Sequence, residues 1–410
     1  MGLSWRSDTR VPQHVSRYSC TRVVCLCARS MVRLPPWRHV ARVALLTPGL
    51  ILPSLSEAQS PLAADSVPVI DLAGTDASGN VRFGNVVGAS RLSNGVIAIA
   101  DGAAGEIRFL GSDGRVLRIV GRSGRGPGEF HRLSWLAQCG DDSLYAWDLT
   151  LRRLTIVDGK RMAVASDQLT PEAQPRSPIP AYLSCSRTGL LAFVGRPANP
   201  DVNGTGSQFE RVSAGLVVGH IGGGHFTTLR TVQVGEIARA SGSWYPRPLG
   251  RTTVLAVSST RLFVGTGDSA AVDVYSLDGT HLRTIRVSSP PRAPDTTHVN
   301  RATAQLTAYL SGDIRERFRS TLRSIPAPRH LAPYSALLAD GNDNLWVVVS
   351  VAGDRETRLQ RYSTQGDGFT EIRIPRDMTV LEVGRDHVLG LYEEEDGEQH
   401  IVMYRLRAPR

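Results

Sequence analysis

Apolar and polar residues alternate along most of the chain, in short runs that turn residues separate. The segment Gly121–Asp158 shows the pattern most fully. A Gly-rich loop leads into an apolar strand, and polar turns then separate a second and a third strand. Alternation with a period of two, in runs rich in β-branched and aromatic residues, indicates strands rather than helices. The sequence therefore predicts an all-β protein.

Six segments repeat this pattern, and they align best on the first residue of the second strand in each copy. The aligned residues are Val96, Leu144, Leu190, Leu262, Leu345 and Val388. Their spacings are 48, 46, 72, 83 and 43 residues. The three short spacings fit a four-stranded propeller blade, and the two long ones require insertions. We therefore expect a six-bladed β-propeller over residues 81–408.

One segment departs from the strand pattern, between blades four and five. Residues 290–333 begin and end with prolines, and between them apolar residues recur at helical spacing over Thr297–Ser324. We expect one or two short helices packed on a propeller face, with a loop as the alternative. The other insertion, Pro197–Phe209, is rich in Gly, Asn and Asp and predicts a plain loop.

Residues 1–58 have the pattern of a leader that ends in a secretory signal. Met31–Arg42 is basic, Val43–Leu55 is mostly apolar, and Ser56–Ala58 has small residues at its ends. These match the three regions of a signal peptide, with Met31 as the expected true start and an untargeted leader as the alternative. The apolar run is too short and interrupted for a stable membrane span. The expected location is secreted or periplasmic.

Residues 59–80 are expected to hold the strand that closes the propeller ring. Val67–Leu72 reads as a short strand, and Ile401–Leu406 lies in the last blade. Pairing between these two segments would remove an open sheet edge, which is an aggregation hazard.

The formal charge of +9 is unevenly placed. Residues 1–58 hold eight Arg against Asp8 and Glu57, so the remaining chain has 39 basic and 36 acidic residues. Such a balance gives no electrostatic footprint for nucleic acid. We expect an unidentified protein or small-molecule partner and a monomeric protein.

Two of the five cysteines lie outside the leader, at matching positions of neighbouring blades. Cys139 and Cys185 each stand five residues before an aligned strand residue, Leu144 and Leu190. An oxidising compartment would permit a disulfide, provided that the two Cα atoms lie within about 7 Å. A disulfide and two buried free thiols both remain open at this point.

Gly121–Asp158 resembles the NHL repeat. Gly126, Gly128 and Phe130 match its loop, while Asp148 and Arg153 match its strand-ending Asp and turn Arg. The motif GRSGRGPGEF and the later segment SALLADGNDNLWVVV are similar to segments found in a group of exported bacterial six-bladed propellers. The resemblance covers roughly residues 80–408. It implies an NHL-like fold and an exported location, and it implies no reaction.

The chain contains none of the motifs G-x-S-x-G, H-E-x-x-H or C-x-x-C, so no catalytic residue is assigned. In the Gly-rich loop, Arg122, Arg125 and Glu129 are candidates to line the channel mouth and contact a ligand. The alternative is a tight crossover between blades. Candidates at or beside the inner strands are Arg91, Tyr334 and Glu382.

Two functions follow, of different classes. The first is an exported binding or interaction module that uses the face carrying the Gly-rich loop and both insertions. It needs no cofactor and no metal. The second is a Ca²⁺-dependent hydrolase or lyase of the lactonase and esterase type, acting in the central channel. Hard cations prefer oxygen ligands, for which Glu129, Asn342, Asp343 and Glu382 are available. We favour the first, which is not an enzyme, and leave the second open.

Overall fold

The structure is a computed structural model, and it describes residues 63–73, 82–169, 180–195, 208–220, 226–363, 368–394 and 397–407. The chain divides into two compact units, Met1–Ala58 and Gln59–Arg410. Every described residue belongs to the second unit. The predicted leader and signal therefore lie outside the described residues.

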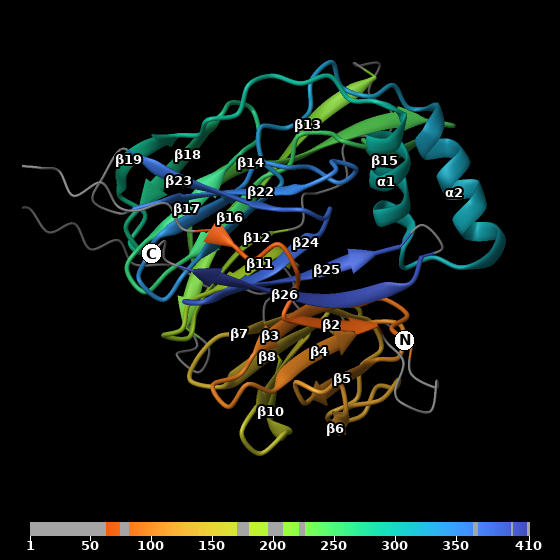
Figure 1. Ribbon diagram of the computed structural model, residues 1–410. Coiled ribbons are helices and arrows are strands. Elements are labelled where there is room, and N and C mark those ends of the chain that lie inside the picture. Colours follow the sequence, from red (N-terminus) through yellow and green to blue (C-terminus); the bar gives the residue numbers. More distant parts are fainter. Residues whose placement is uncertain are drawn as a thin grey trace, which may run out of the picture. The chain divides into compact units, whose positions relative to one another are not determined.

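The described residues form six antiparallel sheets, many of whose strands are labelled in Figure 1. Sheet one holds β3 (Val86–Arg91), β4 (Ile97–Asp101), β5 (Glu106–Leu110) and β6 (Val116–Val120). Sheet two holds β7 (Leu133–Gln138), β8 (Ser143–Asp148), β9 (Arg153–Asp158) and β10 (Ala163–Leu169). Sheet three holds β11 (Pro180–Cys185), β12 (Leu190–Gly195), β13 (Phe209–His220), β14 (Phe226–Ala240) and β15 (Ser243–Pro246).

The other three sheets follow the same order along the chain. Sheet four holds β16 (Val254–Val257), β17 (Leu262–Gly265), β18 (Ala271–Tyr275) and β19 (His281–Arg286). Sheet five holds β20 (Ala336–Ala339), β21 (Leu345–Val348), β22 (Thr357–Tyr362) and β23 (Phe369–Ile374). Sheet six holds β24 (Thr379–Val383), β25 (His387–Glu393) and β26 (Gln399–Arg407), joined by β1 (Ala63–Ala64) and β2 (Ile70–Ala73).

The first strands of the six sheets form a closed ring. Strand β3 contacts β7, and contacts continue from β7 through β11, β16 and β20 to β24. Strand β24 in turn contacts β3, which closes the circle. The fold is therefore a six-bladed β-propeller, as the repeats predict.

The aligned residues of the repeats occupy equivalent places in the six blades. Each lies in the second strand or, for Val96, directly before it. All six are buried, with exposed fractions between 0% and 9%. Their burial between neighbouring blades explains why one apolar residue recurs at this point of every copy.

Strand pairing between the two ends of the unit completes blade six. In the register of β2 and β26, Ile70 lies opposite Met403 and Leu72 lies opposite Ile401. The strand begins three residues later than the sequence suggests, although the Val69 N–H also donates to the Met403 carbonyl, at 2.8 Å. Asp71 of β2 stabilises this pairing, because its carboxylate contacts Arg376 at 3.0 Å and His400 of β26 at 2.9 Å.

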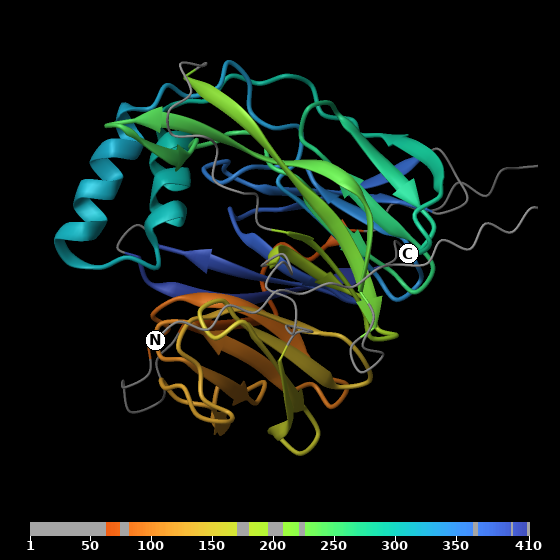
Figure 2. The ribbon, with the colours of Figure 1, turned by 180° about the vertical axis from the view of Figure 1, so that it is seen from behind.

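The expected helical insertion consists of α1 (Thr296–Thr307) and α2 (Gly312–Ser324). Helix α1 begins at a capping box, in which the Asp295 carboxylate accepts the His298 N–H and the His298 ring accepts the Asp295 N–H. Leu322 and Ile325 pack with Ala238 of β14 in a small buried cluster. Figures 1 and 2 show the two helices beside the ends of β13, β14 and β15.

Blade three differs from the expectation of a standard blade with one long loop. Residues 197–207 of the predicted loop lie outside the described residues, and Phe209 already begins β13. Strands β13 and β14 are 12 and 15 residues long, and β15 adds a fifth strand. Much of the extra length between blades three and four is therefore an extended hairpin, which supports the helical insertion.

Candidate binding site at the channel mouth

The six first strands surround a channel that we describe by its two ends. The insertion end is where these strands begin, next to α1 and α2, and the far end is where they finish. At the far end lies a cavity of about 340 Å³. Every first strand contributes to its lining, for example through Ser90, Gln138, Ser184, Val257, Ala339 and Glu382.

Two of the predicted site residues, Arg91 and Glu382, meet at the far end. The Arg91 backbone N–H donates to Glu382 Oε2 at 3.2 Å, and the Arg91 guanidinium lies 3.4 Å from the Asp386 carboxylate. His387 lies between the two acids, with Nε2 3.1 Å from Glu382 and Nδ1 2.9 Å from Asp386. The two carboxylates, the His387 ring and Arg91 thus supply one another's hydrogen-bond and charge partners. This arrangement is typical of a structural cluster.

Electrostatics in this cluster favour the charged form of His387. Burial alone would lower its pKa, but the hydrogen bonds that the ring donates to Glu382 and Asp386 outweigh burial and raise the pKa above its ordinary value. Hydrogen bonding with His387 in turn lowers the pKa of Asp386. The cluster therefore prefers an imidazolium between two carboxylates.

The insertion end opens into a cavity of about 490 Å³, which we call the aromatic cavity. Its aromatic lining comes from Trp135 of β7, Trp147 of β8, Tyr182 of β11 and Tyr309 between α1 and α2. The Arg132 guanidinium lies over the Tyr309 ring, 4.5 Å from its centroid. The aromatic side chains thus come from three strands of two blades and from the insertion, and β16 and β20 complete the lining of this mostly apolar site.

Beside it lies a cavity of about 360 Å³, which we call the polar cavity. Both cavities are lined in part by Ala336 of β20. In the polar cavity, Arg301 of α1 donates to the Glu393 carbonyl at 2.7 Å, and Asp377 accepts the Gly353 N–H at 2.9 Å. Burial raises the pKa of Asp377, and the Gly353 hydrogen bond and Arg301 offset only part of that rise.

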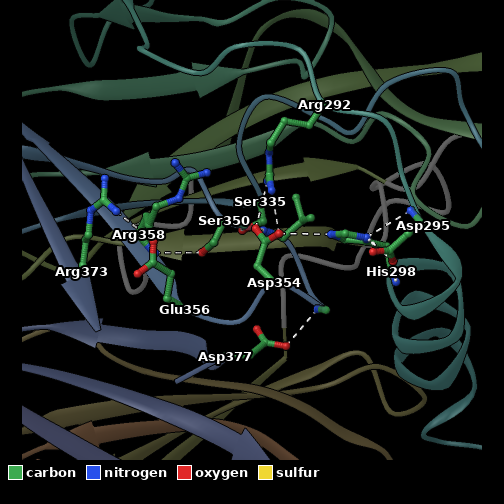
Figure 3. Close-up of polar contacts among 12 residues, drawn as sticks. Arg292, Asp295, His298, Ser335, Ser350, Asp354, Glu356, Arg358, Arg373 and Asp377 are labelled. Atoms are coloured by element: carbon green, nitrogen blue, oxygen red, sulfur yellow. Dashed lines mark hydrogen bonds and ion pairs between the residues drawn. The ribbon is translucent and has the colours of Figure 1, made fainter. Parts of the chain in front are cut away.

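The insertion is anchored beside these cavities by the Asp354 carboxylate, shown in Figure 3. Arg292 donates two hydrogen bonds to it, at 2.7 and 2.9 Å. The Nε2 atom of His298 on α1 lies 3.1 Å from the same carboxylate, and the Val351 N–H donates to it at 2.9 Å. Asp354 belongs to the turn between β21 and β22, so this one side chain connects blade five to the insertion.

The charge state of Asp354 agrees with this anchoring role. Burial raises its pKa, but hydrogen bonds from Arg292, Val351 and His298 together lower it below the ordinary value. The carboxylate is consequently ionised near neutral pH, when it accepts the bidentate Arg292 bonds most strongly.

The predicted residues of the Gly-rich loop do not line any of the cavities described above. Glu129 turns inward within the loop, where its carboxylate accepts the Gly126 N–H at 2.7 Å and pairs with Arg122 at 2.7 Å. These two interactions lower the Glu129 pKa. Arg122 remains largely exposed, and Arg125 lies 3.2 Å from the His131 ring.

The loop is therefore the tight crossover that the sequence offered as its alternative. Arg153 donates to the carbonyls of Gly126 and Glu129, which ties the loop to blade two. Asp148 Oδ2 accepts the N–H groups of His131 and Arg132, at 2.7 and 2.8 Å. The Asp and Arg of the repeat thus hold backbone, and through Asp148 they place Arg132 at the mouth of the aromatic cavity.

Tyr334 is a packing residue between blades four and five, at 2% exposure. Its hydroxyl donates to the Ala271 carbonyl at 2.8 Å and accepts the Gly267 N–H at 3.2 Å. Burial raises its pKa to about 12. Both bonds hold backbone, and Tyr334 lines none of the cavities described above, so its ligand role stays a prediction.

Three of the oxygen ligands considered for Ca²⁺ already have protein partners, and two of these three, Asp343 and Glu382, line the far-end cavity. Asp343 accepts the Ser259 hydroxyl at 2.7 Å and the Thr260 hydroxyl at 3.0 Å, while Glu382 and Glu129 bind the partners given above. Within the described part of the chain, no group of three or more His, Cys, Asp or Glu side chains is arranged to hold a metal ion.

Cys139 and Cys185 form a disulfide between blades two and three, with their Cα atoms 5.4 Å apart. The bond joins the end of β11 to the residue directly after β7, beside the far-end cavity. The structure thus decides between the two states that the sequence left open.

The sequence did not single out Arg132, Trp135, Trp147 or Tyr309 as site residues. Arg132 and Trp135 lie at the start of an inner strand, on the face of the propeller that carries the insertions. Their position in the sequence could therefore have identified them as site residues. Tyr309 was predicted only as one apolar residue of a helix. Its place over the channel depends on how the helical pair packs, which periodicity alone does not specify.

Comparisons with known proteins found similar solved structures but no matching family. No family model matches the chain, and no curated protein matches it. A member of the DUF4221 family from Bacteroides vulgatus aligns at 10% identity over 86% of this chain and 100% of its own, with a TM-score of 0.48.

Two further solved structures are similar to a comparable degree. A gluconolactonase from Xanthomonas campestris aligns at 12% identity over 84% of this chain and 90% of its own, with a TM-score of 0.46. A candidate exported protein from Bacteroides fragilis aligns at 13% identity over 86% and 97%, with a TM-score of 0.44. Because these likenesses are weak, the propeller assignment rests on the six sheets and their closed ring, and the NHL likeness stays a prediction.

Proposed function

We propose that this protein is an exported β-propeller that binds a small molecule at the insertion end of its channel. One observation carries the proposal: the aromatic cavity, which β7, β8, β11, β16, β20 and the helical insertion build together. Sites for small molecules are concave, mostly apolar and a few hundred cubic ångströms in volume. The aromatic cavity has these properties, whereas the cluster at the far end satisfies its own charges.

The insertion supplies the part of the site that a plain propeller would lack. Tyr309 is 53% exposed, and its ring lies under the Arg132 guanidinium at the rim of the cavity. Its backbone lies between two helices, and Asp354 fixes the first of these through His298. The insertion is therefore a positioned wall of the site, and preorganisation of this kind favours binding.

The location outside the cytoplasm is part of the proposal. The Cys139–Cys185 disulfide supports it, because such bonds persist in oxidising compartments. No helix in the described ranges is long and apolar enough to cross a membrane. We keep the expectation of a monomer without a nucleic-acid partner. The Ca²⁺-dependent hydrolase remains the second class, and no contact among the described side chains favours it over binding.

A variant pair tests whether the aromatic cavity binds ligands. A library of small molecules is screened by thermal shift on the wild type, Tyr309→Ser and Ile314→Ser. Ile314 lies on α2, is 58% exposed and does not line the cavity, so its variant controls for removing an exposed apolar side chain from the insertion. We expect ligands that raise the Tm of the wild type and of Ile314→Ser, with at least a tenfold weaker effect on Tyr309→Ser. Ligands that stabilise all three proteins equally would place the site elsewhere and refute the proposal.

A further inference from the structure

Arg132 is a positioned cation at the rim of the aromatic cavity. It directly precedes β7, and its backbone N–H is fixed by Asp148, at 2.8 Å. Its guanidinium stacks on Tyr309 at 4.5 Å from the ring centroid. A cation over an aromatic face is held by the ring quadrupole, so two elements distant in sequence determine where this charge lies.

No carboxylate balances this charge among the side chains that the structure describes. The lining of the aromatic cavity contains no Asp and no Glu, and Arg132 makes no ion pair with a described residue. Neighbouring arginines of the same face differ in this respect: Arg292 pairs with Asp354, and Arg301 lies 3.8 Å from the Glu393 carboxylate. Arg132 therefore differs from them in having its donors available.

The rest of the cavity is apolar or weakly polar. Leu149, Leu183, Val254, Leu255 and Leu337 accompany the aromatic side chains in its lining. The Trp147 indole N–H is also buried in this wall without an acceptor in the described structure. Apolar walls favour an apolar ligand body, and a single guanidinium fork favours a planar carboxylate, which it can bind through two N–H groups.

We propose that the ligand is an amphipathic carboxylate, an acid whose aromatic or aliphatic body fills the aromatic cavity while its carboxylate binds Arg132. The proposal rests on the proposed function, and it specifies the chemical class of the ligand. A monoanion matches the single cation, whereas a dianionic phosphate would enter an apolar cavity with one charge unbalanced.

Isothermal titration calorimetry with two matched probes tests the proposal. The probes are 1-naphthylacetate and 2-(1-naphthyl)ethanol, which share the aromatic body and differ in the carboxylate. We expect the acid to bind the full-length protein with a Kd at least tenfold lower than that of the alcohol. We expect added salt to weaken the binding of the acid and to leave the binding of the alcohol unchanged, because ionic strength screens an exposed charge pair.

Two arginine variants locate the effect. In Arg132→Gln we expect the Kd of the acid to rise about tenfold and the Kd of the alcohol to stay within twofold of wild type. Arg125→Gln removes the same charge from the same inter-blade segment but lies outside the cavity, so it should bind both probes as the wild type does. Equal Tm values for the three proteins show that the comparison concerns binding rather than folding.

The possible outcomes test the ligand class and the proposed function independently of each other. Acid and alcohol binding equally well, with both lost in Tyr309→Ser, would overturn the carboxylate class and leave the binding site standing. Equal weakening of the acid by Arg125→Gln and Arg132→Gln would overturn the role of Arg132, because only the overall charge would matter. If neither probe binds, the class proposed here is wrong, and the library screen on Tyr309→Ser then decides the proposed function independently.

Discussion

At the scale of single residues, several charged side chains around the channel are paired internally, whereas the Arg132 guanidinium has no acidic partner among the described residues. Glu129, Asp148 and Asp354 each bind backbone or a neighbouring cation, and His387 joins two acids. Arg132 has an aromatic partner only. Because Arg132 lies at the rim of an apolar cavity with its donors available, we expect a ligand to supply the acidic partner there.

The His387 cluster predicts how stability depends on pH. Because the pKa of His387 is raised in the folded state, the cluster contributes its full stability below the unfolded pKa of about 6.5. That contribution is lost as the pH rises through the folded pKa. We expect the free energy of unfolding, measured by urea denaturation between pH 5.5 and 9, to fall over the alkaline part of this range.

The variant His387→Gln should remove this decline and lower the free energy of unfolding by about 1–3 kcal/mol at pH 6. The matched control is His220→Gln, which removes an exposed imidazole at the end of β13. It should keep the wild-type pH profile. A decline that persists unchanged in His387→Gln would assign the titration to another group.

At the scale of elements, the seam between blades two and three differs from the others. Its buried cluster has three buried residues, Leu191, Phe193 and Val217, whereas the clusters at the other five seams have 10 to 13 each among the described residues. The disulfide lies at this same seam. The covalent bond therefore joins the two blades whose seam has the fewest buried apolar residues among those that the structure describes.

Removing the disulfide should weaken this seam selectively. A loop of about 46 residues corresponds to roughly 4 kcal/mol in the chain-entropy model, and engineered cases often show less. We expect Cys139→Ser/Cys185→Ser to lose about 2–4 kcal/mol of unfolding free energy. Hydrogen exchange should accelerate most in β11 and β12, and reduction of the wild type should have the same effect. Uniform exchange across all blades would show that the seam is not a local weak point.

How far the sequence specifies these elements depends on how local their signals are. The aligned residues Val96 to Val388 predict six blades because each must be buried against its neighbour. The helical pair is predicted because its period differs from that of the strands. The extended β13–β14 hairpin is not predicted, since its added length carries no pattern that separates strand from loop. The tight crossover of the Gly-rich loop was one of two alternatives, and only the contacts of Glu129 decide between them.

At the scale of the described propeller, ring closure and the insertion together create the site. Strand β24 contacts β3, and β2 pairs with β26, so the inner strands enclose a channel whose two ends differ. The far end is lined by residues from all six first strands and contains the self-satisfied cluster of Glu382 and His387. The insertion end combines strands from different blades with Tyr309 from another part of the chain. This long-range convergence explains why the sequence predicted the face but not the residues.

The most direct test of the account is a crystal structure of the protein with 1-naphthylacetate. We expect the naphthyl ring among Trp135, Trp147 and Tyr309, with the carboxylate within hydrogen-bonding distance of the Arg132 guanidinium. Density for the ligand at the far end beside Glu382, or on the exposed Gly-rich loop at Arg122 and Arg125, would contradict it.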